Sequence, residues 1–497
     1  MKHRKAKTRR RFPGGAWRPG IVAVTLAVLV GLQIYWWGWP VPQVFQPVGQ
    51  NRWQTADGRQ LEAQDLDGDG TYDRFSHTDG SFRRPAAKAK GSRLLIVCLD
   101  GVPFSVMREL WEQGRFREFF PPVELVSTFP SESEVALTAL LNAPPSHGYE
   151  NLYYDRKAGE VTGGISVTLA QSAPYLKKFD YDEPAIFKGI HFIVPFKSFR
   201  ADLGRLRERF LESSAPTYVA HISSTDGLYH ISPPERLRPL MLEFESLLRD
   251  LYFDAEGKLR LLVFSDHGNN LAPSRAAPLR QSLESAGFQV RNRLDGPLAV
   301  VIPRFGLVSF AAVFARRAVV PQLARVLAAT AGVDAVAYSH RGLLRVQNRN
   351  GEAVIEADRK GTRFLYRAER GDPLRLLPVW EKLRKQHKLD AAGFAREREL
   401  FAATIAGPFP DALFRLFESG LLEGKGFVEN RADLLVSLAD GYYNGSGLFE
   451  RLVDFQSTHG GLGRGSTMGF AMATDAPFSR ALRYNELLRP PAFSLPR

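Results

Sequence analysis

Three apolar runs, each followed by acidic residues and histidines, constrain the fold of this chain more than any other feature. The runs lie at 93–99 (RLLIVCL), 217–222 (TYVAHI) and 261–264 (LLVF). The residues that follow them are Asp100, then Asp226 and His230, then Asp266 and His267. Short apolar runs predict buried strands. In open α/β sheets, ligands gather at the carboxyl ends of the strands. The sequence therefore predicts an α/β sheet that brings carboxylates and imidazoles to one edge.

Two further residues complete this set. Ser133 precedes the apolar segment 134–141 (EVALTALL), which predicts a helix. Its hydroxyl would then lie at a helix N-terminus, where free N–H groups favour an anion. The simpler alternative is that Ser133 is only a helix cap. His459 adds an imidazole late in the chain. Together, these side chains suit a two-metal centre with a nucleophile between the ions.

Five segments carry a resemblance to a known family. They are LIVCLDG (95–101), TFPSES (128–133), TDGLYH (225–230), FSDHGN (264–269) and STHGG (457–461). In this order, they resemble the alkaline phosphatase superfamily, and within it the type I phosphodiesterase/nucleotide pyrophosphatase branch. The resemblance implies an α/β fold in which an alkaline-phosphatase-like sheet has helices on both faces.

The resemblance also implies the division of the site. Asp100, Asp266, His267 and Ser133 would hold one metal ion, and Asp226, His230 and His459 a second. Mixed carboxylate and imidazole ligands suit zinc first, and manganese or iron next. Ser133 would be the nucleophile, and Asn151 would bind a phosphoryl oxygen. The alternative for Asn151 is a turn residue. The remaining histidines, His221 among them, are expected to be structural.

The implied function is metal-dependent phosphoester hydrolysis through a phosphoryl-serine, with a phosphodiesterase or pyrophosphatase as the expected activity. The substrate would be a small phosphoester or a lipid headgroup. Three alternatives stay open: a phosphomonoesterase, a headgroup phosphotransferase, and a tethered binding protein without activity.

The N-terminus predicts a membrane anchor. Residues 1–20 are strongly basic, and residues 21–39 contain no charge. Nineteen apolar residues are enough for one membrane span, and a basic flank favours a cytoplasmic N-terminus. We therefore expect a single-pass inner-membrane protein with its body in the periplasm. A cleaved signal peptide is the alternative. Because the tail supplies most of the net charge of +13, the charge does not indicate nucleic-acid binding.

Residues 40–91 are predicted to form a linker with a small ordered element. The linker contains acidic residues at alternating positions, Asp65, Asp67, Asp69 and Asp73. Such spacing resembles a calcium loop, although Ser76 stands where an EF-hand has a bidentate Glu. An acidic surface turn is the alternative.

The rest of the chain divides into three predicted regions. Residues 92–296 would form the first part of the catalytic core, 297–375 an inserted α+β cap domain, and 376–497 the second part of the core. Segment 105–119 predicts a helix after the first strand, and Asn350-Gly351 predicts a hairpin turn.

Overall fold

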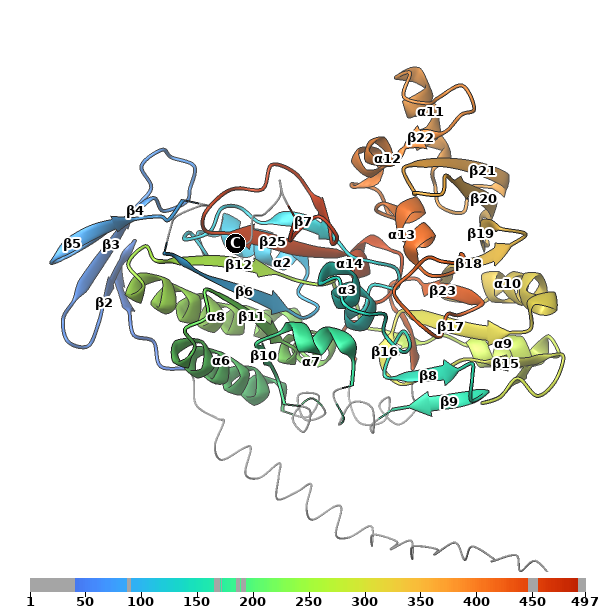
Figure 1. The fold of residues 1–497 in the computed structure, drawn as a ribbon, viewed down its shortest axis with the longest axis horizontal. Helices are drawn as coiled ribbons and strands as arrows, with labels where there is room; N and C mark the ends of the chain where they lie inside the picture. The colour runs from blue at the N-terminus through green and yellow to red at the C-terminus, as the bar shows by residue number, and fades with distance from the viewer. Residues whose placement is uncertain are drawn as a thin grey trace, which may run out of the picture.

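The computed structural model describes residues 41–86, 91–164, 170, 172–184, 188, 194–445 and 455–489 (Figure 1). The predicted basic tail and the predicted membrane span at 21–39 lie outside these residues. Across the described part of the chain, no helix combines the length and apolar character that a membrane crossing needs.

The segment predicted to be a linker contains an ordered antiparallel sheet. Its strands are β1 (Gln46–Gly49), β2 (Arg52–Gln54), β3 (Gln60–Gln64), β4 (Arg74–His77) and β5 (Gly80–Arg83). Trp53 and Phe75 lie edge-on or tilted to Phe253 of a core helix, with ring centroids 5.2 and 5.6 Å away. These aromatic residues anchor the small sheet to the core, so the ordered part of 40–91 is larger than its Gly- and Pro-rich composition indicated.

A seven-stranded sheet forms the core. Its order is β10 (Tyr181–Asp182), β11 (Thr217–Ile222), β6 (Arg93–Leu99), β12 (Leu259–Phe264), β25 (Met468–Ala473), β7 (Val123–Val126) and β26 (Leu482–Arg483). The first four strands are parallel, and β25 is antiparallel to both of its neighbours. All three strands predicted from apolar runs are confirmed, and they are adjacent.

Helices cover both faces of this sheet. Alternate residues of β6 enter different cores: Leu95, Val97 and Leu99 one, Leu94, Ile96 and Cys98 the other. The first core is shared with α2 (Phe104–Glu112), α6 (Pro195–Glu212), α7 (Ser224–Ile231) and α8 (Pro234–Asp254). The second is shared with α3 (Ser133–Leu140) and η1 (Pro174–Lys178). Helix α2 ends earlier than predicted because Gly114 and Phe116 have positive φ angles, which a right-handed helix excludes.

A nine-stranded sheet forms the second unit (Figure 1). Its order is β14 (Gln289–Val290), β15 (Ala299–Val301), β17 (Phe310–Ala315), β23 (Leu434–Leu438), β18 (Val333–His340), β19 (Leu343–Asn348), β20 (Gly351–Ala357), β21 (Arg363–Gly371) and β22 (Ala395–Arg396). One face packs on α9 (Leu279–Ser285) and α10 (Val320–Ala329). The other packs on α11 (Leu377–Lys385), α12 (Glu397–Thr404) and α13 (Ala412–Glu418).

The predicted cap is therefore part of a larger unit. Strand β23 and helices α11–α13 come from the region assigned to the second part of the core, but they complete the nine-stranded sheet. The apolar pattern of that region showed helices, but not the sheet that they cover. The predicted hairpin is present, but Arg349 and Asn350 form its turn, and Gly351 already pairs with Asn348.

Several short elements lie outside the two large sheets. They are β8 (Leu152–Asp155), β9 (Glu160–Gly163), β13 (Arg275–Ala276), β16 (Leu307–Val308), η2 (Arg317–Val319), β24 (Tyr442–Gly445) and α14 (Arg464–Thr467). An isolated antiparallel bridge pairs Ser131, just before α3, with Gly460. The loop around Gly460 therefore lies between the helix that starts at Ser133 and the second sheet.

Candidate metal centre

Strand register brings the predicted ligands together. Cys98 of β6 pairs with Phe264 of β12, so Asp100 and Asp266 leave the sheet at the same level two residues later. On the other side of β6, Ile222 of β11 pairs with Leu99, and α7 begins immediately afterwards. Three neighbouring parallel strands thus end side by side, which is the arrangement that the apolar runs predicted.

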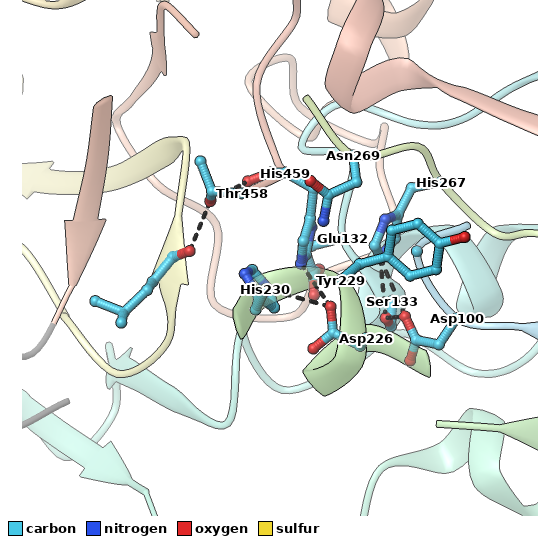
Figure 2. A network of polar contacts seen from close by, with 12 residues as sticks. Asp100, Glu132, Ser133, Asp226, Tyr229, His230, His267, Asn269, Thr458 and His459 are labelled. Carbon is cyan, nitrogen blue, oxygen red and sulfur yellow. Dashed lines mark hydrogen bonds and ion pairs between the residues drawn. The ribbon is translucent and has the colours of Figure 1, made fainter. Parts of the chain in front are cut away.

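The first cluster consists of Asp100, Asp266 and His267. Figure 2 shows Asp100 and His267 beside Ser133. The Nε2 atom of His267 lies 3.4 Å from Oδ1 of Asp100 and 3.6 Å from Oδ2 of Asp266. The side chains of Asp266 and His267 are 0% exposed, and that of Asp100 is 7% exposed. Ser133 lies beside them, with Oγ 3.0 Å from Oδ1 of Asp100 and 3.2 Å from Nε2 of His267.

The second cluster consists of Asp226, His230 and His459. Oδ1 of Asp226 lies 3.0 Å from Nε2 of His230 and 3.3 Å from Nε2 of His459. Asp226 and His230 are four residues apart on α7, so they lie on one helical face, as the spacing predicted. The rings of His267 and His459 stack with centroids 3.9 Å apart, so the two clusters are adjacent.

Each of the three histidines is oriented by the backbone. Nδ1 of His230 is 2.9 Å from the carbonyl of Ser457, and Nδ1 of His267 is 2.9 Å from that of Gly268. Nδ1 of His459 is 3.0 Å from the carbonyl of Ser131. A carbonyl only accepts, so in each ring the Nδ1 atom donates and Nε2 is directed at the carboxylates. Histidines that bind metal ions in proteins are usually held in this way.

The donor set fits divalent cations. Within the part of the chain that the structure describes, Oδ1 of Asp226 and Oδ2 of Asp266 are buried and have no hydrogen-bond partner of good geometry. In each cluster, one donor atom per residue lies within 4.8 Å of the others. Buried, unpaired carboxylate oxygens are costly unless a cation compensates them. Two carboxylate–imidazole clusters side by side are therefore suited to two metal ions.

The pKa values reflect close charges in a buried site. Burial and the charge of Asp100 raise the pKa of Asp266 to about 6. Burial alone would also raise the pKa values of Asp100 and Asp226, but their histidine partners outweigh it and lower both. Burial opposes protonation of His267, yet Asp266 and Asp100 raise its pKa to about 9. The raised pKa of Asp266 thus reflects a second carboxylate close by in a buried site.

Ser133 is the first residue of α3, and Glu132 is the cap. The Glu132 carboxylate accepts hydrogen bonds from the amides of Glu134 and Val135, at 3.0 and 2.8 Å. The interpretation of Ser133 as a simple cap is therefore wrong, because Glu132 makes the capping contacts. The Ser133 hydroxyl is left free to contact the first cluster, and the residue is partly exposed while the ligands around it are buried.

Two residues of this site were not identified from the sequence. His221 was expected to be structural, but it contacts Asp100, with Nε2 3.1 Å from Oδ2. The signal was a histidine inside an otherwise apolar strand run. Arg415 of α13 is 1% exposed and donates to the carbonyls of Thr128 and Leu462 and to Oγ of Ser131. Nothing near Arg415 in the sequence indicates this contact.

Phosphoryl binding by Asn151 and calcium binding by the acidic loop remain predictions. Asn151 lies next to Glu134 and Glu150 in a small pocket, and its backbone carbonyl accepts a hydrogen bond from the Gly164 amide at 2.9 Å. In the acidic loop, oxygens of Asp65, Asp67 and Asp73 lie within 4.8 Å of one another. Oxygens of Asp65 and Asp73 accept hydrogen bonds from loop amides, so the loop is also explained as a surface turn.

Comparisons with known proteins found likeness only among solved structures. No protein-family model and no curated protein sequence matches the chain. Phosphonoacetate hydrolase from Sinorhizobium meliloti 1021, in complex with phosphonoformate, is 15% identical, with a TM-score of 0.40 over 84% of this chain and 95% of that one. Human ectonucleotide pyrophosphatase/phosphodiesterase 5 is 11% identical, with a TM-score of 0.40 over 80% and 92% of the two chains.

Identities of 15% or less and TM-scores of 0.40 assign no activity or substrate to this chain.

Proposed function

We propose that this protein is a metal-dependent phosphoesterase that acts through Ser133. The observation that carries the proposal is the position of the Ser133 hydroxyl. It lies partly exposed at the N-terminus of α3, within 3.2 Å of both Asp100 and His267. A nucleophilic hydroxyl beside two buried carboxylate–imidazole clusters is the arrangement that phosphoryl transfer needs.

The proposed residue roles follow from these contacts. The Ser133 hydroxyl donates to Oδ1 of Asp100, and its proton is released to solvent as Oγ attacks. Oγ then forms a bond to phosphorus while the bond from phosphorus to the leaving oxygen breaks, and that oxygen takes a proton from solvent. Water subsequently displaces Oγ and restores the serine. The amides at the start of α3 favour negative charge next to Ser133.

The two clusters would hold the metal ions. Asp100, Asp266 and His267 would bind one, with the Ser133 oxygen, and Asp226, His230 and His459 the other. When bound, such ions lower the pKa of the nucleophile and stabilise charge on the phosphoryl and leaving oxygens. Zinc suits this mixture of ligands first, and manganese or iron next.

Replacing Ser133 tests the proposal. We expect Ser133→Ala to reduce hydrolysis of bis(p-nitrophenyl) phosphate by at least about a thousand-fold, because the atom that bonds to phosphorus is lost. Metal content, measured by mass spectrometry of the full-length protein in detergent, should change little. Ser133→Thr is the matched control, since it keeps a hydroxyl and should keep much of the activity. Near wild-type turnover in Ser133→Ala on every phosphoester tested would contradict the covalent mechanism.

Substrate class needs a separate experiment. We propose a phosphodiesterase or pyrophosphatase, and the alternatives are a phosphomonoesterase, a headgroup phosphotransferase and a binding protein. A panel of aryl diesters, aryl monoesters and nucleotides separates a phosphodiesterase or pyrophosphatase from a phosphomonoesterase. Adding an alcohol acceptor identifies a transferase by its product. No turnover on the whole panel, with metals bound, would leave only the binding protein.

We also propose that residues 21–39 anchor the protein and that its body lies in the periplasm. The charge-free stretch after a basic tail supports this topology. Protease added to intact spheroplasts should digest the body, and digestion only after lysis would contradict the proposed orientation.

A further inference from the structure

His221 lies in the fold as a link between two carboxylates. It belongs to β11 and is 1% exposed. Its Nε2 atom is 3.1 Å from Oδ2 of Asp100, and its Nδ1 atom is 2.8 Å from Oδ1 of Asp182. The ring also stacks on Phe179, with centroids 5.0 Å apart and planes inclined by 22°.

These distances fix what the ring donates. An ionised carboxylate only accepts hydrogen bonds, so each ring nitrogen can act toward its carboxylate only as a donor. The second oxygen of Asp182 lies 2.7 Å from Nζ of Lys188. The result is a row of polar side chains in contact that runs from Asp100 through His221 and Asp182 to Lys188.

The contact with His221 determines which oxygen of Asp100 is available to a cation. Its Oδ2 atom is occupied by His221, whereas Oδ1 faces Ser133 at 3.0 Å and His267 at 3.4 Å. Asp100 therefore presents one oxygen, not two, to a cation in the first cluster. A one-oxygen carboxylate suits a four-coordinate zinc ion. Manganese favours more oxygen ligands in an octahedral arrangement, and a carboxylate with both oxygens free would serve it better.

We propose that His221 is a positioning residue that restricts Asp100 to one-oxygen ligation and so favours zinc over manganese in the first cluster. This inference rests on the metal centre of the proposed function. It differs from a packing role because packing on Phe179 does not depend on the ring nitrogens.

Metal affinity, not turnover, tests this role. The full-length protein is stripped of metal, and zinc and manganese dissociation constants are measured by competition with a chromophoric chelator. His221→Phe keeps a ring against Phe179 but removes both donors. We expect zinc affinity to fall about 10- to 100-fold, the usual effect of removing a contact that orients a ligand. Manganese affinity should fall less than about threefold, so the ratio of zinc affinity to manganese affinity should fall by at least about threefold.

Two further variants complete the design. Phe179→Leu removes the stacked ring but leaves both His221 contacts, and it should leave the zinc preference unchanged. His221→Gln keeps one amide donor and should lie between the wild type and His221→Phe, even if the latter folds poorly. Equal loss of both metals in the two His221 variants, or no loss of either, would overturn the inference. A wild-type protein that binds neither metal would instead overturn the metal centre on which the proposed function rests.

Discussion

The two clusters of the metal centre use the same side chains but have different support. Asp266 and His267 of the first cluster are fully buried, whereas the side chain of Asp226 in the second is 20% exposed. The first cluster has an additional charged neighbour, His221, at Oδ2 of Asp100. In the second, the contacts that orient His230 and His459 are to backbone carbonyls. Equal ligand types therefore do not imply equal metal sites.

The difference has a simple origin in the fold. The first cluster comes from the ends of β6 and β12, which are hydrogen-bonded neighbours in the middle of the sheet. The second combines one face of α7 with the loop that contains His459, from distant parts of the chain. Adjacent strands fix relative positions more tightly than a helix and a loop do. We expect the first cluster to bind its ion more tightly and release it more slowly.

The largest expected effect compares the buried carboxylates. Asp266→Asn should lower phosphodiester hydrolysis by about a thousand-fold or more, about 4 kcal/mol of transition-state stabilisation, and should remove the first ion. Asp226→Asn should remove only the second ion and leave the first in place. Metal stoichiometry and turnover of both variants check this. In metal-free protein, Asp266→Asn should not lower the unfolding temperature, because one of two close buried carboxylates is neutralised. Loss of both ions in either variant would show that the clusters bind as one unit.

The two clusters should release their metal ions at different rates. A chelator added to the loaded protein should extract the ion of the second cluster first, because the side chain of Asp226 is more exposed than those of Asp100, Asp266 and His267. We expect two kinetic phases of about equal amplitude, separated by about tenfold or more in rate, a difference of about 1.4 kcal/mol in barrier. In Asp226→Asn the fast phase should disappear. A single phase in the wild type would mean that the difference in burial has no consequence for release.

The sequence predicted the first cluster better than its surroundings. Asp100, Asp266 and His267 follow apolar runs, and strand register carries them to one place, so local pattern and topology agree. Asp226 and His230 were predictable as a pair because their spacing matches a helical turn. His459 was found by its motif alone, since nothing in its neighbourhood shows which strands it will face.

The supporting residues could not be predicted in the same way. His221 and Asp182 are 39 residues apart, and Arg415 is 284 residues from Ser131. Such contacts depend on the packing of whole units, which periodicity does not encode. The extent of the second sheet was missed for a related reason. Strand β23 lies between β17 and β18 in the sheet but follows them by about a hundred residues, and non-local pairing leaves no local signal.

Arg415 allows the support of the second cluster to be tested. It donates to Ser131 Oγ at 2.8 Å and to the Leu462 carbonyl at 2.9 Å, and the Ser131 carbonyl orients His459. Arg415→Met removes several hydrogen bonds from a charged donor, although the Leu462 carbonyl keeps Thr467 Oγ1 and the Thr128 carbonyl keeps Ser131 Oγ. We expect a loss of about 2–4 kcal/mol of unfolding free energy. It should also accelerate chelator extraction from the second cluster more than from the first.

The control for Arg415 is Arg483 of β26, another buried arginine, whose Nε atom lies 2.6 Å from Oδ2 of Asp411, the residue just before α13. Arg483→Met should lower stability without a selective effect on extraction. Equal acceleration of both phases in Arg415→Met would indicate general loosening of the fold and not support of the second cluster.

The smallest expected effect concerns a hydroxyl that links the backbone of α7 to the backbone of Asp100. Thr225, at the start of α7, donates to the backbone carbonyl of Asp100 at 2.7 Å and to that of Ile222 at 2.8 Å. Thr225→Val keeps the shape but removes the donor, so the buried Asp100 carbonyl loses this hydrogen bond. The Ile222 carbonyl keeps the amide of Asp100, at 3.3 Å. We therefore expect a loss of about 1 kcal/mol in unfolding free energy. Thr225→Ser retains the hydroxyl and should recover most of the lost unfolding free energy. If the clusters are independent, chelator kinetics should not change in Thr225→Val; if this hydrogen bond couples them, the two phases should move closer together.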